Sequence, residues 1–163
     1  MPDAEEPRGG RRDETFDEKM DRNWAELLQE LRVLQTGVQI LAGFLLTLPF
    51  QTRFETLDGF QLALYLTNVV LAALTTALIL LPVSAHRRLF RKGLKDTLVA
   101  SADRIAKVAL AGVALLSVGT SALVFDVAAG RAAGLTAGAA LLAILLALLV
   151  LIPNRLRRQT GRG

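Results

Sequence analysis

The sequence predicts an all-α integral membrane protein, a four-helix bundle with helical extensions on its cytoplasmic side. Of its 163 residues, 52% are hydrophobic and 21% are charged, a larger apolar share than a soluble domain of this length uses. The charges also gather in three segments, residues 1–32, 87–107 and 155–162. The gaps between these segments are too long for the amphipathic helices of a soluble protein, in which polar positions recur at every turn.

The N-terminal region divides into a tail and a helix. Residues 1–14 are expected to form a disordered polar tail, because they carry too few apolar groups to offset the entropy of ordering. Thr15 and Glu18 fit a capping box, in which each side chain satisfies a free backbone amide at a helix start. A helix is therefore expected from about Phe16. Leucines recur along it at helical spacing, which indicates a helix at the membrane interface.

Four apolar segments are long enough to cross a bilayer. At 1.5 Å per residue the first of them extends over about 27 Å, close to the hydrocarbon thickness of about 30 Å. The second is expected to end near Pro82, where proline at a helix end removes no needed hydrogen bond. The expected spans are residues 33–50, 61–83, 105–127 and 132–153. They lie within a transmembrane domain of residues 15–157, and residues 158–163 form a basic tail after it.

The distribution of basic residues predicts how the chain is threaded. Of the 19 Lys and Arg residues, 17 lie in the two terminal segments and the middle connection. The positive-inside rule therefore assigns both termini and the middle connection to the cytoplasm. We expect a multi-pass protein of the bacterial cytoplasmic membrane whose basic surface lies on anionic lipid headgroups. Orientation and lipid contact account for the net charge of +4, so no nucleic-acid partner is expected.

The composition also limits the chemistry. The chain has no cysteine and one histidine, so a thiolate metal site is excluded and a zinc site would need ligands from another chain. The stretch GRAAGLTAG lacks the lysine of a phosphate-binding P-loop. No nucleophile and base with sensible mutual placement can be identified. We therefore expect no cofactor, no metal and no enzymatic activity.

Polar side chains within the spans are the first candidates for function, because such groups are costly in hydrocarbon. Gln35, Gln39 and Thr47 lie on one face of the first span, and Asn68 lies in the second. These residues either join helices by hydrogen bonds or line a pathway. We expect them in polar layers between helices, with Asn68 turned away from lipid. Asp126, at the outer edge of the third span, is the only carboxylate within the spans.

Two further groups of residues are candidates for contacts between helices. A charge latch is possible in which Glu26 and Glu30 face the basic connection; the alternative is that these are solvated charges worth little individually. The basic members of this latch would be Arg87, Arg88 and Arg91. The second group favours close packing of another helix, either within the chain or in an oligomer, because small residues on one face let backbones approach. It consists of Gly130, Gly134 and Gly138.

The runs ELLQELRVLQTGVQILAGFLLTLPFQTRF and LLPVSAHRRLFRKGLK are similar to an uncharacterised family of small bacterial membrane proteins. The family is mainly actinobacterial and carries a domain-of-unknown-function label. The resemblance covers residues 16–157 and implies four membrane helices. Some family members have been named automatically as sodium:proton antiporters. This chain departs from known antiporter families because it has no mid-membrane Asp or Glu.

Two functions are compatible with these observations. The first is a non-enzymatic interaction or accessory subunit, associated with a membrane protein partner or with further copies of itself. It rests on the absence of deep charge together with a highly charged cytoplasmic surface. The alternative is a small cation or proton transporter or channel, with the glutamines and Thr47 lining a path and Glu26 and Glu30 forming an inner cation site.

Overall fold

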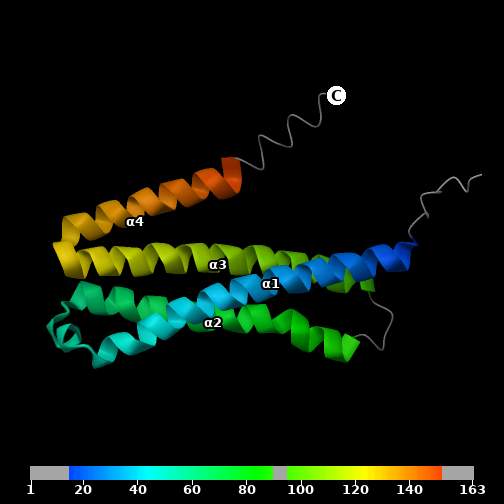
Figure 1. The fold of residues 1–163 in the computed structure, drawn as a ribbon, viewed down its shortest axis with the longest axis horizontal. Helices are drawn as coiled ribbons and strands as arrows, with labels where there is room; N and C mark the ends of the chain where they lie inside the picture. Colours follow the sequence, from blue (N-terminus) through cyan, green and yellow to red (C-terminus); the bar gives the residue numbers. More distant parts are fainter. Residues whose placement is uncertain (1–14, 90–94, 152–163) are drawn as a thin grey trace, which may run out of the picture.

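The computed structural model of the chain describes residues 15–89 and 95–151. These residues form four long helices and contain no strand, so the fold is all-α (Figure 1). The helices are α1 (Phe16–Thr47), α2 (Gly59–Leu89), α3 (Lys95–Ala129) and α4 (Arg131–Leu146). Two short 3-10 turns, η1 (Leu48–Phe50) and η2 (Thr52–Thr56), follow α1, and a π-helical turn, η4 (Ala147–Leu151), continues α4.

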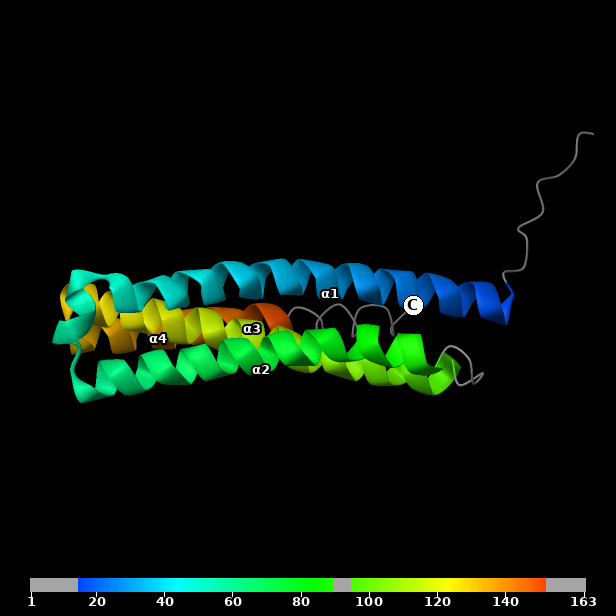
Figure 2. The same ribbon diagram turned by 90° about the horizontal axis from the view of Figure 1, so that it is seen from below.

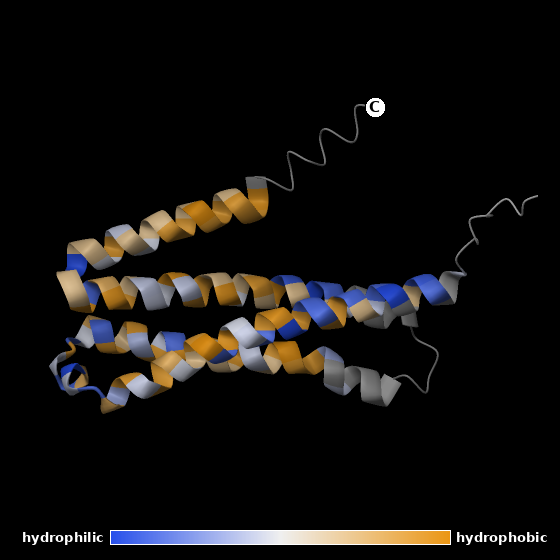
Figure 3. Ribbon diagram, in the orientation of Figure 1, coloured by the Kyte–Doolittle hydropathy of each residue, from blue (hydrophilic) through white to orange (hydrophobic). Residues whose placement is uncertain are grey.

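The two ends of the molecule differ in what they contain. The turns η1 and η2 and the α3–α4 connection at Gly130 lie together at one end, which we call the loop end (Figures 1 and 2). The start of α1, the end of α2 and the start of α3 lie at the other, which we call the N-terminal end. Figure 3 shows hydrophilic residues along the coloured parts of α1 and α3 nearest the N-terminal end, and mostly hydrophobic ones along α4.

Helix α1 begins as the sequence predicts. The Thr15 hydroxyl accepts a hydrogen bond from the Glu18 backbone N–H at 3.3 Å, and the Glu18 carboxylate accepts one from the Thr15 backbone N–H at 2.9 Å. This is the expected capping box. The helix then runs without a break to Thr47. The expected interfacial helix and the first span are therefore a single rod of 32 residues.

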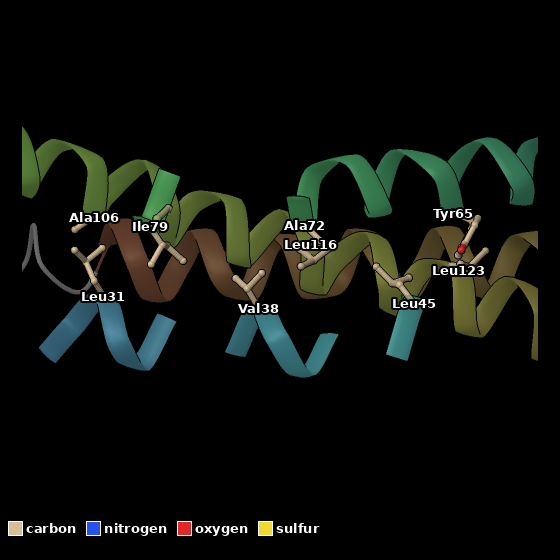
Figure 4. Close-up of a cluster of buried hydrophobic side chains, with 10 residues drawn as sticks. Leu31, Val38, Leu45, Tyr65, Ala72, Ile79, Ala106, Leu116 and Leu123 are labelled. Atoms are coloured by element: carbon tan, nitrogen blue, oxygen red, sulfur yellow. The ribbon is translucent and has the colours of Figure 1, made fainter. Parts of the chain in front are cut away.

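The core of α1, α2 and α3 follows a seven-residue repeat. Such a repeat keeps one seam of each helix facing its neighbours when helices wrap around one another with a left-handed twist. Figure 4 shows the α1 side chains of this seam pointing toward those of α2 and α3. The buried apolar residues that follow the repeat are Leu31, Val38 and Leu45 of α1, Tyr65, Ala72 and Ile79 of α2, and Ala102, Ala109, Leu116 and Leu123 of α3.

Helix α4 stands apart from this core. It packs on α3, on the side away from α1 and α2, and it diverges from α3 toward residue 151 (Figure 1). Of its residues, only Gly134 and Gly138 are buried. The expected four helices are thus arranged as a three-helix bundle with a fourth helix attached along α3. The uneven burial leaves the opposite face of the bundle, between α1 and α2, without a covering helix.

All four helices are long and apolar enough to cross a membrane. Large apolar side chains point outward along them, with Ile40 68% exposed and Val33 64% exposed. Soluble proteins rarely expose continuous apolar surface of this extent, whereas a lipid environment requires it. The segments that meet the length and hydropathy criteria are Glu18–Phe50, Gly59–Pro82, Ser101–Ala129 and Arg131–Val150.

One helix boundary differs from expectation. Helix α2 does not end near Pro82 but continues to Leu89, with Pro82 buried inside it. Proline removes one backbone hydrogen bond, but neighbouring helices make such a loss tolerable within membrane helices. Helix α3 starts at Lys95, so the later part of the expected basic connection is the first part of α3. The remainder of that connection, residues 90–94, lies outside the described residues.

Candidate functional site

Three helices meet in a polar cluster at the loop end. Asp126 of α3 accepts a hydrogen bond from the Gln61 side-chain amide of α2 at 2.6 Å. Its other carboxylate oxygen lies 3.1 Å from Nε of Arg131, the first residue of α4. Arg131 also pairs with Asp58, just before α2. Because the Asp126 side chain is only 3% exposed, the carboxylate is buried with its charge compensated.

Local structure positions each member of this cluster. The Asp58 carboxylate caps α2 by accepting hydrogen bonds from the backbone N–H groups of Phe60 and Gln61, both at 2.9 Å. The Gln61 N–H bond, followed by the Arg131 guanidinium, holds the pKa of Asp58 below its usual range. The Arg131 guanidinium lies 3.9 Å from the centroid of the Phe60 ring, a cation–π contact. The cluster therefore fastens α2, α3 and α4 to one another.

The sequence indicated Asp126 but not its partners. Asp126 does not pair with Arg53, the basic residue of the first short loop, and its side chain is not exposed to solvent. Arg53 instead donates a hydrogen bond from Nη1 to the backbone oxygen of Val127 at 3.3 Å. Arg131 reaches Asp126 because Gly130, with φ of 91°, turns the chain from α3 into α4 within one residue. The expected spans place this turn within residues 128–131, but they do not predict the backbone conformation of Gly130 that brings Arg131 to Asp126.

Two buried polar side chains lie between α2 and α3. Asn68 donates to the Leu64 backbone oxygen at 3.0 Å and Thr75 to the Leu71 oxygen at 2.7 Å, each within its own helix. Each faces a glycine of α3. A Cβ atom built on Gly119 would lie 2.2 Å from Oδ1 of Asn68, and one built on Gly112 would lie 2.5 Å from Oγ1 of Thr75. Asn68 is therefore turned into the bundle. The absence of a side chain at Gly119 leaves room for Asn68, and the absence of one at Gly112 leaves room for Thr75.

The spacing of residues in the sequence is consistent with the pairs Asn68–Gly119 and Thr75–Gly112, although close packing was expected only for the glycines of α4. Positions 61, 68 and 75 are seven apart on α2, and positions 126, 119 and 112 are seven apart on α3. In an antiparallel pair of wrapped helices, such positions meet in this order. Nothing in the sequence, however, specifies which seven-residue series of α3 faces α2.

The polar stripe of α1 lies apart from Asn68. Gln35 is half-buried, while Gln39 and Thr47 are exposed. The Thr47 hydroxyl donates to the Phe44 backbone oxygen at 2.7 Å in its own helix. The four polar residues singled out in the first two spans are therefore not brought together. Within residues 15–89 and 95–151, the Gln39 amide has no hydrogen-bond partner.

A groove runs between α1 and α2 on the face that α4 leaves uncovered. Its volume is about 420 Å³. Gln39 precedes two lining residues, Ala42 and Leu46, by three and seven positions, so it lies on the same edge of α1. The groove is lined by Ala42, Leu45 and Leu46 of α1 and by Val69, Ala72, Ala73, Thr76, Ala77 and Leu80 of α2.

The acidic side of the expected latch lies at the N-terminal end. Glu26 is 3.8 Å from Arg22 in an exposed pair on α1. Glu26 and Glu30 line a shallow hollow of about 310 Å³ together with Asp103 of α3, which itself pairs with Lys107 at 2.5 Å. No group of acidic or histidine side chains in the described segments has the arrangement of a metal site. Arg87, Arg88 and Arg91 fall outside the described side chains, so the latch stays a prediction.

The glycines of α4 serve two different purposes. A Cβ atom on Gly134 would lie 2.6 Å from Cβ of Asp126, and one on Gly138 would lie 3.1 Å from Cβ of Ala122. Both therefore lie at the contact between α4 and α3. Gly130 does not belong to this contact, because an added Cβ would meet nothing within 4 Å. The small-residue face is thus occupied within the chain, which leaves little of it for an oligomer.

Comparison with known proteins gives one positive result. No curated protein and no solved structure matches the chain. A family model described as "Family of unknown function (DUF6328)" matches residues 13–153. The match includes all four helices and both the polar cluster and the groove. This chain therefore belongs to DUF6328, a family of unknown function.

Proposed function

We propose that this chain is a non-enzymatic accessory subunit of the bacterial cytoplasmic membrane that binds a transmembrane helix of a partner protein in the α1–α2 groove. The observation that carries the proposal is the Gln39 side chain. It is exposed and without a hydrogen-bond partner in the described residues, within an apolar span. An amide left unpaired in hydrocarbon costs several kcal/mol, about 4–8 kcal/mol on the water-to-cyclohexane scale. A helix that offers a hydrogen-bonding side chain would remove this cost.

The lining of the groove suits such a partner. Ala42, Ala73 and Ala77 are small, so a neighbouring backbone can approach closely. Leu46 and Leu80 add apolar surface at the edges of the groove. Small residues with one polar residue are typical of helix contacts in lipid, where packing and interhelical hydrogen bonds replace the hydrophobic effect as the driving force.

The proposed orientation follows from charge. Of the basic residues that the structure describes, most lie toward the N-terminal end, which would face the cytoplasm with the loop end outside. Both chain termini are then cytoplasmic. A tag at either terminus that proved accessible to a membrane-impermeant reagent in intact cells would contradict this orientation.

Site-specific photo-crosslinking in native membranes tests the proposal. A photoreactive residue at Leu46 or Ala77 lies in the groove, whereas the same residue at Ile40 or Leu74 lies on an exposed surface outside the lining. We expect one defined partner to be captured from both groove positions and from neither control, and Gln39→Leu to reduce its capture. Equal capture from all four positions, or capture that is unaffected by Gln39→Leu, would argue against the groove.

Ion transport is the second candidate, and buried Asp126 is the observation that favours it. Proton or cation exchange needs a group that charges and discharges. Asp126, however, lies at the loop end and is held by Arg131 and Gln61. Protein in liposomes should move neither Na⁺ nor H⁺ faster than empty liposomes. Flux above that background, abolished by Asp126→Asn, would replace the subunit proposal with transport.

A further inference from the structure

A second apolar hollow lies at the loop end, between the end of α1, the turn η2 and the end of α3. Its volume is about 260 Å³. Phe44 and Leu48 of α1 form one wall, Phe54 of η2 forms another, and Leu123 and Val127 of α3 form the third. It lies on the side of α1 that faces α3, whereas the α1–α2 groove lies on the other side. The two sites are therefore independent of each other.

The walls of this hollow are held in place. The Phe54 ring meets the ring of buried Tyr65 edge to face, with centroids 5.0 Å apart. Backbone hydrogen bonds from Phe54 N–H to the Gln51 oxygen at 2.9 Å and from Leu57 N–H to the Phe54 oxygen at 3.2 Å hold the turn. Leu123 is 2% exposed and belongs to the core. The hollow is thus part of the folded structure and does not need to be opened by a ligand.

Arg53 is also one of the residues that line the hollow, and most of its hydrogen-bonding capacity is unused. Its guanidinium makes one hydrogen bond, to the Val127 oxygen, and has no carboxylate partner in the part of the chain that is described. A guanidinium has five N–H donors. The other arginine at this end, Arg131, is by contrast engaged by Asp58, Asp126 and the Phe60 ring. Arg53 is therefore the cation at this end that is available to an external anion.

The depth of Arg53 suits a lipid phosphate. The first membrane-spanning segment ends at Phe50, three residues before Arg53. Phe50 is 87% exposed, as expected for an apolar side chain at the edge of the hydrocarbon. A guanidinium just beyond that edge lies at headgroup level, while the apolar hollow extends beside it toward the hydrocarbon.

We propose that this hollow is a phospholipid site, in which one acyl chain lies against the apolar walls and the lipid phosphate binds the Arg53 guanidinium. The planar guanidinium can donate two parallel hydrogen bonds to phosphate oxygens. Inorganic phosphate lacks the chain that fills the hollow, and diacylglycerol lacks the anion. The complete phospholipid supplies both, so it should bind far more tightly than either part.

The proposal can be tested with phosphatidylglycerol as the probe. Its binding to delipidated full-length protein in detergent is measured by native mass spectrometry. We expect one tightly bound lipid per chain and an affinity at least tenfold lower in Arg53→Gln. Ala128→Trp fills the hollow and should abolish tight binding. Its matched control is Ala129→Trp, because Ala129 is the next residue, is exposed and lies outside the lining. Diacylglycerol should bind the original chain as weakly as phosphatidylglycerol binds the Arg53→Gln variant. Inorganic phosphate should not compete with phosphatidylglycerol for the original chain.

Three results would overturn the proposal. The first is that the original chain and Arg53→Gln bind phosphatidylglycerol with equal affinity. The second is that Ala128→Trp and Ala129→Trp lose this affinity equally. The third is that diacylglycerol binds as tightly as phosphatidylglycerol. Arg53→Lys guards against a folding defect, because it keeps the charge but not the paired donors and should retain an intermediate affinity. The melting temperature of each variant, measured in the same detergent, shows whether the bundle is intact.

Discussion

A Cβ atom on Gly134 would lie 2.6 Å from Cβ of Asp126 and 2.7 Å from the backbone oxygen of Ala122. Helix α4 therefore meets α3 almost backbone to backbone, at the residue that also pairs with Arg131. Since the burial of α4 is concentrated at Gly134 and Gly138, the position of the whole helix depends on this contact.

Gly134→Ala should separate α4 from α3. Ala122 contributes a backbone atom to the clash, which cannot rotate away as a side chain would. We expect the free energy of unfolding to fall by about 1–3 kcal/mol, the usual cost of overpacking. Reversible unfolding in mixed micelles measures it. Gly37→Ala is the matched control, because an added Cβ there meets nothing within 4 Å and alanine favours the helix. Equal stability of the two variants would contradict the contact.

Arg131→Met should leave the buried Asp126 carboxylate without its charge partner. The expected loss is about 3 kcal/mol, the lower end of the range for a broken buried pair, because the Arg131 side chain is 39% exposed. Adding Asp126→Asn should restore much of the stability in a double-mutant cycle. Lys107→Met is the control, since its pair with Asp103 is exposed and should contribute less than about 1 kcal/mol. Additive losses in the cycle would show that the pair is not coupled.

Acid should weaken the start of α2 through Asp58. The pKa of Asp58 in the folded chain is lower than its ordinary value of 3.8, chiefly because of the hydrogen bond from the Gln61 N–H. A depressed folded pKa gives stability that is complete above the ordinary value and is lost as pH falls through the folded value. Asp58→Asn keeps the capping oxygen but cannot titrate. The unfolding midpoint of the original chain should therefore fall more steeply below pH 3.8 than that of Asp58→Asn; parallel curves would exclude this carboxylate as a source of the pH dependence.

Gly119→Ala should disturb the α2–α3 contact by displacing the Asn68 amide. Asn68 is 1% exposed, so its side chain has little space in which to move. A loss of about 1–3 kcal/mol is expected. Gly119→Ala combined with Asn68→Ala should cost less than the sum of the two single changes, because the clash disappears with the amide. Gly43→Ala, with nothing near its added Cβ, should be close to neutral. A Gly119→Ala variant as stable as Gly43→Ala would show that the helices can separate there at no cost.

The sequence by itself determined the helical fold class, the number of long apolar helices and the start of α1. These features are local or one-dimensional, because span length and hydropathy need no partner and the capping box of Thr15 and Glu18 closes within one turn. The sequence also predicted that Asn68 is turned away from lipid, since an amide that faces lipid has no hydrogen-bond partner.

Only the tertiary structure decided which residues face one another. Asn68 meets Gly119, Asp126 meets Arg131 and Gln61, and the glycines of α4 are occupied by α3. The register and rotation of one helix against another depend on the packing of all side chains at once, and several seven-residue series on α3 match α2 equally well in one dimension. The attachment of α4 to α3 alone leaves the α1–α2 groove and Gln39 uncovered. Mean hydropathy averages over all sides of a helix, and for that reason it cannot predict which face is left open.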